Sequence, residues 1–282
     1  MIEQITVLGS GTMGRGIAHI AALAGYETVL YDLEIELLDS ARAGIEANLR
    51  KSVEKSKISQ SAMDEALGRL HLSTDLEGAS QSADLIIEAV PEDLELKREL
   101  FSQVDLFCGE RTILATNTSS LPIRELASAV ELRDRFIGLH FFNPPHLMKL
   151  LEIVVGERTS EETVDEARAL AKRLGKEAIV VRDSPGFATS RLGVAIGLEA
   201  IRMLEDEVGS AEDIDRAMEL GYNHPMGPLR LTDLVGLDVR LSIAEHLVAT
   251  LGERFTPPQL LRDLVAQGKL GKKTGEGFYR WE

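Results

Sequence analysis

The chain has 282 residues, of which 44% are hydrophobic and 27% charged, and it carries a formal net charge of −15 at pH 7. This composition is typical of a soluble globular protein with one large domain or two smaller ones. The negative charge argues against nucleic acid or an anionic membrane surface as a main partner, and it means that an anionic substrate would need a local basic patch.

The cysteine content and the apolar runs narrow the class further. The single cysteine, Cys108, excludes an internal disulfide and belongs to no metal-ligand pattern, so we expect no metal site. No apolar run approaches the ~18 residues of a membrane-spanning helix. The first strand signal begins almost at Met1, which leaves no room for a targeting peptide unless one has already been removed. We therefore expect a cytoplasmic protein.

The first predicted elements are a strand, a glycine-rich turn, a helix and a second strand. An apolar run at residues 4–8 leads into GSGTMG at residues 9–14, and a second strand at 27–31 ends at an aspartate. Three glycines in this context permit a tight turn, the close approach of a pyrophosphate and close helix packing, while the helix N-terminus attracts phosphates. The pattern predicts a dinucleotide site formed by Gly9, Ser10, Gly11, Thr12, Met13, Gly14 and Asp32.

Asp32 also favours NAD as the cofactor. Its carboxylate would accept hydrogen bonds from the adenine ribose hydroxyls and would repel the 2′-phosphate of NADP. The next residues, Leu33 and Glu34, supply no arginine to receive that phosphate. We therefore predict NAD in preference to NADP.

Further strand signals follow at residues 84–90, 111–116, 135–141, 150–155 and 177–181, and helical patterns separate several of them. This alternation predicts an α/β fold with a Rossmann-like doubly wound sheet. The polar helical region at 34–68 is interpreted as an insertion, and it carries a basic run at 50–57. Such a run is usually a solvated helix face, but it could also bind a phosphate-bearing substrate, and both interpretations stay open.

The pattern changes at the Pro-Gly pair of residues 185–186. Strand signals stop there, and helical patterns follow at 187–207, 213–220 and about 229–251. Ser210, ahead of the second of these patterns, resembles an N-cap. The helix at 187–207 is apolar on more than one side, which is typical of burial in a core or a subunit interface. We predict an NAD-binding domain at 1–184 and a smaller all-helical domain at 185–282.

Three kinds of side chain suited to proton transfer follow consecutive strand signals. A hydroxyl cluster occupies residues 118–120, His140 ends the next strand, and Glu152 lies within the one after that. Consecutive elements are usually neighbours, so these groups could meet at one edge of the sheet and move a proton on or off a substrate oxygen. Taken alone, each could be a satisfied polar group. With the dinucleotide motif, they indicate an NAD-dependent dehydrogenase of a small alcohol or hydroxy acid.

Seven motifs, spread along the chain, identify its resemblance to a known family. They are VLGSGTMGRGIA at 7–18, EAVPEDLELKRELF at 88–101, ATNTSSLPI at 115–123, GLHFFNPPHLMKLLEIV at 138–154, DSPGF at 183–187, HPMGPLRLTDLVGLD at 224–238 and GKKTGEGFY at 271–279. Over essentially its whole length the sequence resembles the L-3-hydroxyacyl-CoA dehydrogenases, of the short bacterial 3-hydroxybutyryl-CoA dehydrogenase type. The resemblance implies reversible NAD-linked oxidation of (S)-3-hydroxyacyl-CoA to 3-oxoacyl-CoA. It also implies a homodimer that pairs through the helical domains.

The same resemblance implies roles for individual residues. His140 matches the general base for the substrate 3-hydroxyl, Glu152 the carboxylate that orients its imidazole, and Ser119 a serine that hydrogen-bonds the substrate oxygen near the nicotinamide. Asn48 and Lys55, in the helical insertion, match positions that meet CoA, which supports a binding role for the basic run. Cofactor contacts are implied for Glu92, Lys97, Ser119, Asn143 and Lys273.

One position departs from the family pattern. After the SPGF motif the family commonly has an asparagine before an arginine, and here Ser190 precedes Arg191. The family asparagine is thought to help fix the substrate carbonyl and the histidine–glutamate pair. A serine hydroxyl is shorter and offers one donor instead of two, so Ser190 could serve the catalytic site directly or through a water, or could simply begin a helix.

Two alternatives to a CoA-linked dehydrogenase stay open from the sequence. One is an NAD-dependent dehydrogenase on the same fold that acts on a 3-hydroxy acid without CoA. The other is a non-catalytic NAD-binding protein that has kept the fold, against which the presence of Ser119, His140 and Glu152 argues.

Overall fold

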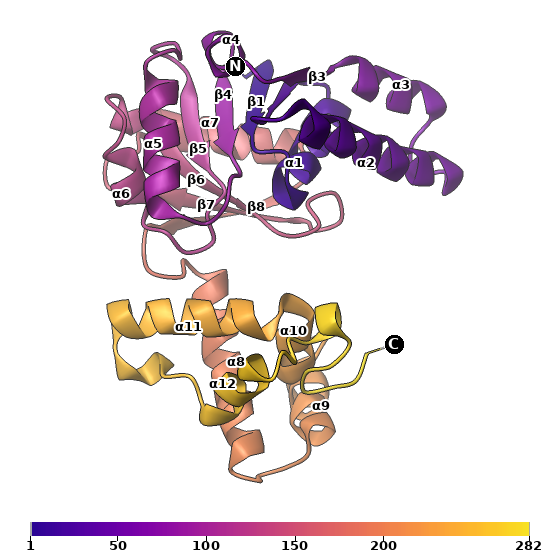
Figure 1. Cartoon of the computed structure of the whole chain (residues 1–282), viewed down its shortest axis with the longest axis vertical. Helices are drawn as coiled ribbons and strands as arrows, with labels where there is room; N and C mark the ends of the chain where they lie inside the picture. Colours follow the sequence, from indigo (N-terminus) through magenta and orange to yellow (C-terminus); the bar gives the residue numbers. More distant parts are fainter. Residues whose placement is uncertain (1, 282) are drawn as a thin grey trace. The chain divides into compact units, whose positions relative to one another are not determined.

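The computed structural model describes residues 2–281, which form two compact units divided between Asp183 and Ser184. Each unit has its own cluster of buried apolar side chains. Figure 1 shows the first unit as a sheet flanked by helices and the second as a group of helices. None of the helices within residues 2–281 combines the length and the hydropathy that a membrane crossing requires.

The first unit is built on one eight-stranded sheet with the order β3-β2-β1-β4-β5-β6-β7-β8. All neighbouring strands are parallel except β6 and β7, which are antiparallel. The predicted Rossmann-like doubly wound fold is confirmed. The order in which successive strands are added to the sheet reverses between β1 and β4, the position where such sheets bind ligands. The strands are β1 Gln4–Leu8, β2 Glu27–Tyr31, β3 Leu70–Ser73, β4 Leu85–Glu88, β5 Ile113–Thr116, β6 Phe136–Phe141, β7 Leu150–Val155 and β8 Glu177–Arg182.

Three helices of this unit begin after a residue whose side chain satisfies one of their first N–H groups. Ser59, Asp93 and Ser160 each accept a hydrogen bond from a backbone N–H one turn into α3, α5 and α7. In Figure 1, α2 and α3 lie beside α1 at the β3 edge of the sheet. The helices are α1 Thr12–Leu23, α2 Ile35–Glu54, α3 Gln60–Gly68, α4 Leu76–Gln81, α5 Leu94–Asp105, α6 Ile123–Ala127 and α7 Glu161–Arg173, with a 3-10 turn η1 at Arg133–Arg135.

The structure refines the predicted elements of the first unit. The helical insertion at 34–68 is two helices, because α2 ends at Glu54, Ser56 adopts φ +54° and Ser59 caps α3. The four-residue β3 and the short α4 were not predicted, since neither is long enough to show a clear periodicity. The strand predicted at 84–90 ends at Glu88, whose carboxylate accepts a hydrogen bond from the N–H of Val90 at 2.7 Å.

The second unit is all helical, as predicted. The predicted single helix at about 229–251 is wrong, because Gly236 adopts φ +108° and separates two helices. The predicted cap at Ser210 is confirmed, since its hydroxyl accepts from the N–H of Asp213 at 3.1 Å. The helices are α8 Thr189–Glu205, α9 Ala211–Tyr222, α10 Pro228–Val235, α11 Leu237–Leu251 and α12 Gln259–Ala266, with 3-10 turns η2 Glu253–Phe255 and η3 Lys272–Thr274; α12 was not predicted.

Candidate active site

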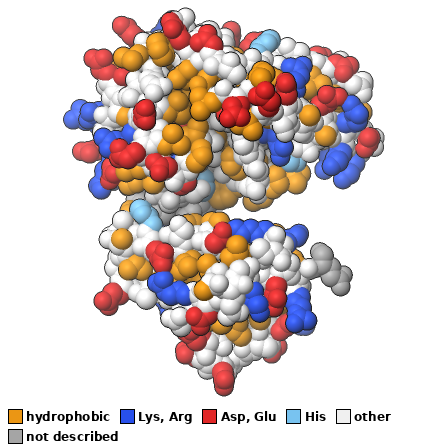
Figure 2. All heavy atoms as spheres, in the orientation of Figure 1, with side chains coloured by type: hydrophobic (Ala, Val, Ile, Leu, Met, Phe, Trp, Pro, Cys, Tyr) orange, Lys and Arg blue, Asp and Glu red, His pale blue; other side chains and the backbone are white. Residues whose placement is uncertain are grey.

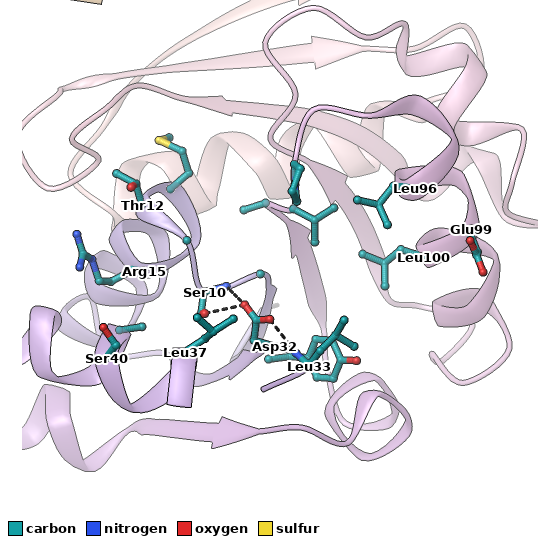
Figure 3. A pocket seen from close by; sticks show the side chains of 18 of the residues that line it. Ser10, Thr12, Arg15, Asp32, Leu33, Leu37, Ser40, Leu96, Glu99 and Leu100 are labelled. Carbon is teal, nitrogen blue, oxygen red and sulfur yellow. Dashed lines mark hydrogen bonds between the residues drawn. The ribbon is translucent and has the colours of Figure 1, made fainter. Parts of the chain in front are cut away.

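A cavity of about 900 Å³ opens in the first unit at the carboxyl ends of β1, β2 and β4 (Figure 3). The glycine-rich turn forms its floor, and the first turn of α1 lies at one side with no side-chain cap on its N–H groups. Uncapped N–H groups at a helix N-terminus attract an anion such as a phosphate. The residues of the predicted dinucleotide motif that line the cavity are Gly9, Ser10, Gly11, Thr12, Met13 and Asp32.

The glycines of the turn fit the close approach of a dinucleotide. Gly9 adopts φ +96°, and a Cβ there would lie 2.9 Å from the carbonyl oxygen of Ala89. A Cβ on Gly14 would lie 1.8 Å from the carbonyl oxygen of Gly9, so only glycine lets α1 pack this close to the turn. An added Cβ on Gly11 meets no protein atom within 4 Å, because this position borders the cavity. A ligand backbone can therefore approach the chain here.

Asp32 is held rigidly at the end of β2. Its Oδ2 accepts hydrogen bonds from the N–H and hydroxyl of Ser10 at 2.7 and 2.6 Å, and its Oδ1 accepts from the N–H of Leu33 at 2.8 Å (Figure 3). All three donors are neutral groups, so these hydrogen bonds do not neutralise the negative charge of the Asp32 carboxylate. This arrangement suits ribose hydroxyls and disfavours a phosphate at the same position.

The sequence did not indicate the other walls of the cavity. Leucine side chains from the β2–α2 connection, α2 and α5 line it, and Leu33, Leu37 and Leu96 remain 80%, 48% and 43% exposed. Exposed leucines around a polar floor are suited to a flat apolar ring such as adenine. Arg15 on α1 also lines the cavity, although the cofactor argument from sequence considered only the residues just after Asp32.

The antiparallel pairing of β6 and β7 places His140 directly opposite Glu152. The two side chains are 5% and 0% exposed, and Nδ1 of the imidazole lies 2.8 Å from Oε2 of the carboxylate. The carboxylate accepts from Nδ1–H, which leaves the lone pair on Nε2 and stabilises a proton gained there. The imidazole ring also packs on Phe142 at a centroid distance of 4.5 Å. This pair has the geometry of a general base with an orienting acid.

The hydroxyl-bearing loop after β5 is fastened by Glu92. Oε1 of Glu92 accepts hydrogen bonds from the Thr118 hydroxyl at 2.6 Å, the Ser119 N–H at 2.9 Å and the Ser120 hydroxyl at 3.3 Å. A half-buried Ser119 is thereby held at the carboxyl end of β5. Three hydrogen bonds to one oxygen limit the conformations of the loop. They fix the backbone at Ser119 and, with it, the region that the Ser119 hydroxyl can reach.

A buried ion pair lies under this loop. Lys97, 1% exposed, donates to Oε1 of Glu88 at 2.5 Å and lies 3.3 Å from Oε2 of Glu92. Thr116 donates to the other oxygen of Glu88 at 2.7 Å. Burial raises the pKa of the Glu88 carboxyl, and the charge of Lys97 together with its hydrogen bonds acts in the opposite direction. The sequence did not single out Glu88. The cofactor contact expected of Lys97 stays a prediction, and in this structure its ammonium pairs with two carboxylates of the protein.

The remaining candidates of the first unit lie at its surface. Asn143 is exposed in the loop after β6, and Asn117 accepts a hydrogen bond from the N–H of Phe141 at 2.8 Å, which ties the ends of β5 and β6 together. Asn48 is half-buried on α2, and Lys55 is exposed at its C-terminus. An exposed lysine carries a point charge on a flexible stem, which can reach a negatively charged ligand at the surface.

Two further candidates belong to the second unit. Ser190 is the second residue of α8 and half-buried. The ammonium of Lys273 forms an ion pair with the Asp238 carboxylate at 2.6 Å, and this bond helps to lower the pKa of Asp238 against the effect of burial. Within residues 2–281, no group of three or more His, Cys, Asp and Glu side chains is arranged to hold a metal ion.

Two family models match the chain in succession. The first, "3-hydroxyacyl-CoA dehydrogenase, NAD binding domain", matches residues 4–184, and the second, "3-hydroxyacyl-CoA dehydrogenase, C-terminal domain", matches residues 186–281. A probable 3-hydroxybutyryl-CoA dehydrogenase of Bacillus subtilis is 44% identical over 100% of this chain and 98% of its own. The mitochondrial hydroxyacyl-coenzyme A dehydrogenase of Sus scrofa is 43% identical over 100% of this chain and 92% of its own.

Solved structures are similar over the full length as well. The crystal structure of an (S)-3-hydroxybutyryl-CoA dehydrogenase from Ralstonia eutropha has a TM-score of 0.96 and 38% identity, with 100% of each chain covered. A diketoreductase described as acting on dicarbonyl compounds has a TM-score of 0.87 and 32% identity, with 99% of each chain covered.

Proposed function

Since the chain belongs to the 3-hydroxyacyl-CoA dehydrogenase family and is an NAD-dependent oxidoreductase, we propose that it interconverts (S)-3-hydroxyacyl-CoA and 3-oxoacyl-CoA. The favoured substrate in this proposal is 3-hydroxybutyryl-CoA, the substrate that gives several relatives their names. The observation that carries the proposal is the buried His140–Glu152 pair, with 2.8 Å between Nδ1 and Oε2.

In the oxidative direction, Nε2 of His140 takes the proton of the substrate 3-hydroxyl. Glu152 keeps the proton on Nδ1 before this step and stabilises the imidazolium after it, as a buried carboxylate beside an imidazole does. Bound NAD supplies the acceptor for the hydride from C3 of the substrate. In the reductive direction, the imidazolium returns its proton to the carbonyl oxygen.

Ser119 donates a hydrogen bond to the same substrate oxygen in this proposal. Its support is the position of Ser119 on the loop that Glu92 fastens, at the carboxyl end of the sheet. Asp32 and the glycine-rich turn hold the adenosine and phosphate parts of NAD. Further contacts to the cofactor are assigned to Glu92, Lys97, Asn143 and Lys273. Contacts to CoA are assigned to Asn48 and Lys55, and a contact to the substrate carbonyl to Ser190.

A turnover assay tests this proposal most directly. The purified protein should oxidise NADH in the presence of acetoacetyl-CoA, and the loss of NADH absorbance measures the rate. A protein that binds NADH and turns over no 3-oxoacyl-CoA of any chain length would refute the proposal and favour a non-catalytic role.

The similarity to a diketoreductase supports a second candidate substrate, a hydroxy or oxo compound without CoA. The two substrate classes differ in the nucleotide end of CoA. Free CoA or adenosine 3′,5′-bisphosphate should inhibit a CoA-dependent enzyme competitively, and neither compound should affect an enzyme that acts on the free acid.

Replacing Asp32 with alanine is expected to weaken NADH binding by about 1.5–3 kcal/mol, the free energy of hydrogen bonds to a charged group. The preference for NADH over NADPH should also narrow, because the charge that repels a 2′-phosphate is gone. Fluorescence titration with each nucleotide measures both effects. Ser10→Ala is the matched control, since it removes a bond to Asp32 and keeps the charge. A wild-type protein that prefers NADPH would contradict the assignment.

Replacing Lys55 with alanine is expected to raise KM for acetoacetyl-CoA and to change kcat little, because a grip on phosphate is equal in the ground and transition states. The effect should shrink as salt rises, since exposed charges are screened over about 10 Å at ~0.1 M ionic strength. Arg111→Ala, which removes an exposed charge outside the basic run, before β5, is the control. If acetoacetyl-pantetheine suffers the same loss, Lys55 acts on the fold and not on CoA.

A further inference from the structure

One charged side chain is buried in the second unit without a partner. Arg240, on α11, is only 7% exposed, although arginine is almost never fully buried in proteins unless it is paired. Its Nε has no hydrogen-bond partner, and none of the ion pairs within residues 2–281 involves its guanidinium. Figure 2 shows basic and acidic side chains interspersed on the visible face of this unit, where neighbours and water balance each charge. An interior guanidinium has no such compensation.

The guanidinium of Arg240 lies against a glycine of α8. Helix α11 packs on α8 (Figure 1), and a Cβ added to Gly193 would lie 2.9 Å from Nη1 and 3.7 Å from Cζ of Arg240. The missing side chain at Gly193 therefore makes the space in which the guanidinium lies. The same face of α11 is otherwise apolar, since Ala244 and Leu247, one and two turns further on, belong to the buried core of the unit.

This environment makes Arg240 a receptor for an anion. Burial lowers the pKa of its guanidinium to about 10, and no carboxylate in the described part of the chain lies near enough to oppose this shift. The group stays positively charged at neutral pH in a poorly solvated position. A buried charge without a partner destabilises the ligand-free protein, and an anion that binds beside it removes this cost.

The chemistry of the guanidinium favours a carboxylate. Its planar fork donates two parallel hydrogen bonds to the two oxygens of a carboxylate, and its single positive charge neutralises the single negative charge. Lys273 adds no free charge to this position. Its ammonium lies beside Gly236, one turn earlier on the same face, and is already paired with Asp238.

Arg240 also lies close to a residue assigned above to the substrate. Ser190 precedes Gly193 by three positions on α8, so the two residues are neighbours on one side of the helix, with about 5–6 Å between their Cβ positions. Carbon–carbon bonds are about 1.5 Å long. An acyl chain of about six carbons therefore reaches from a carbonyl group at Ser190 to the guanidinium that lies against Gly193.

From these observations we propose that Arg240 recognises a carboxylate at the far end of the acyl chain. The preferred substrates are then 3-hydroxyacyl-CoA thioesters of dicarboxylic acids with about six carbons. The inference rests on the proposed function, leaves its reaction unchanged and names the acyl group. Arg240 contacts the tail of the substrate and determines specificity. An acidic group of a second copy of this chain is the competing source of the carboxylate.

The substrate preference of the wild type is the first test. With NADH, kcat/KM for 3-oxohexanedioyl-CoA should exceed that for 3-oxohexanoyl-CoA by about tenfold or more, the effect of one charge-assisted hydrogen bond. The two substrates have the same chain length and differ in the terminal carboxylate. Equal values, or a preference for the monoacid, overturn the inference. Acetoacetyl-CoA tests the proposed function separately, since turnover of it without a preference for the diacid contradicts only the role of Arg240.

Replacing Arg240 with methionine removes the charge and keeps much of the volume. The preference for the diacid should disappear, mainly through a higher KM, because a grip on the tail is equal in the ground and transition states. Arg240→Lys keeps the charge without the planar fork and should keep part of the preference. Arg216→Met is the matched control, because it removes an exposed arginine from α9 of the same unit. A wild-type preference in Arg240→Met overturns the inference.

Stability measurements distinguish recognition from a structural role. Methionine at position 240 takes no partner from any protein group, so the ligand-free variant should unfold at the same temperature as the wild type or higher. 3-Oxohexanedioyl-CoA should raise the Tm of the wild type more than 3-oxohexanoyl-CoA does, and this difference should vanish in Arg240→Met. A variant that is less stable and keeps the preference would show that Arg240 is structural.

Gly193→Ala provides a second variant in case Arg240→Met does not fold. Its methyl group would lie 2.9 Å from Nη1 and displace the guanidinium without removing the charge, while alanine favours the helix. The preference for the diacid should fall in this variant, and an unchanged preference contradicts the inference.

The oligomeric state tests the competing source of the carboxylate. Sedimentation velocity should give the same mass for the wild type and for Arg240→Met, because the substrate supplies the carboxylate. A lower mass for the variant, together with an unchanged substrate preference, would assign Arg240 to a contact between copies and overturn the inference.

Discussion

Replacing His140 with glutamine is expected to lower kcat by about 10²–10⁴-fold, the usual effect of removing a general acid–base group. Glutamine keeps much of the side-chain volume and can donate to Glu152, but it cannot take a proton from the substrate hydroxyl. NADH binding should remain nearly intact, because the cofactor cavity is lined by β1, β2, β4, α1, α2 and α5 and not by β6. Steady-state turnover of acetoacetyl-CoA and a separate NADH titration measure the two quantities.

The comparison variant for this prediction is Glu152→Gln. Its amide oxygen can still accept from Nδ1–H, but the charge that stabilises the imidazolium is lost, so kcat should fall by less than in His140→Gln. Because Glu152 is 0% exposed, thermal unfolding of both variants must be measured beside turnover. Wild-type-like turnover in a folded His140→Gln variant would remove His140 from the mechanism.

Replacing Lys97 with methionine is expected to lower the free energy of unfolding by about 3–5 kcal/mol at neutral pH, the cost of leaving one partner of a buried ion pair alone. Methionine fills similar space and offers no charge to Glu88, which is 0% exposed. Glu92 would also lose a cationic neighbour at 3.3 Å, so the loop that bears Ser119 should loosen. Urea denaturation gives the free energy, and KM for acetoacetyl-CoA reports on the loop.

The sign of the pH dependence provides an internal check on the Lys97→Met variant. Burial raises the pKa of Glu88 above its unfolded value, and loss of Lys97 removes the charge that opposed this shift. The neutral carboxyl is then the form that folding favours. The stability deficit should be small below the unfolded pKa of about 4.3 and should grow as pH rises above it.

The double variant Glu88→Gln/Lys97→Met removes both buried charges and is the matched control. It should recover part of the stability that the single variant loses, because no charge is left without a partner. If Lys97→Met has the same free energy of unfolding as the wild type at neutral pH, water reaches Glu88 and the carboxylate does not depend on Lys97 for its charge to be stabilised.

The sequence by itself determined the features that short stretches of chain encode. Strand β1, the GSGTMG turn and α1 follow one another within twenty residues, and the clash that requires glycine at position 14 is with the carbonyl oxygen of Gly9 in the same stretch. The change from strands to helices near residue 184 is likewise visible in local periodicity. The cap at Ser210 needs only a hydroxyl and a helix that begins after it. Local hydrogen bonding and hydrophobic periodicity are sufficient to predict these elements.

Elements without a strong local signal were missed or merged. Strand β3 has four residues, Leu70–Ser73, and is a strand because β2 lies beside it. The division between α10 and α11 depends on the φ of +108° at Gly236 and on a hydrogen bond from Leu237 N–H to Leu270 O, thirty-three positions further along the chain. A partner so distant in sequence cannot be seen in a local window.

The site required the tertiary structure for its geometry. The spacing of His140 and Glu152 predicted that they could meet, but the antiparallel register of β6 and β7 decided that they lie directly opposite each other. Burial of Lys97 against Glu88 and of Arg240 against Gly193 had no counterpart in the sequence patterns. Which charges become neighbours, and which are removed from water, depends on how distant segments pack, since desolvation and Coulomb energies are properties of the assembled chain.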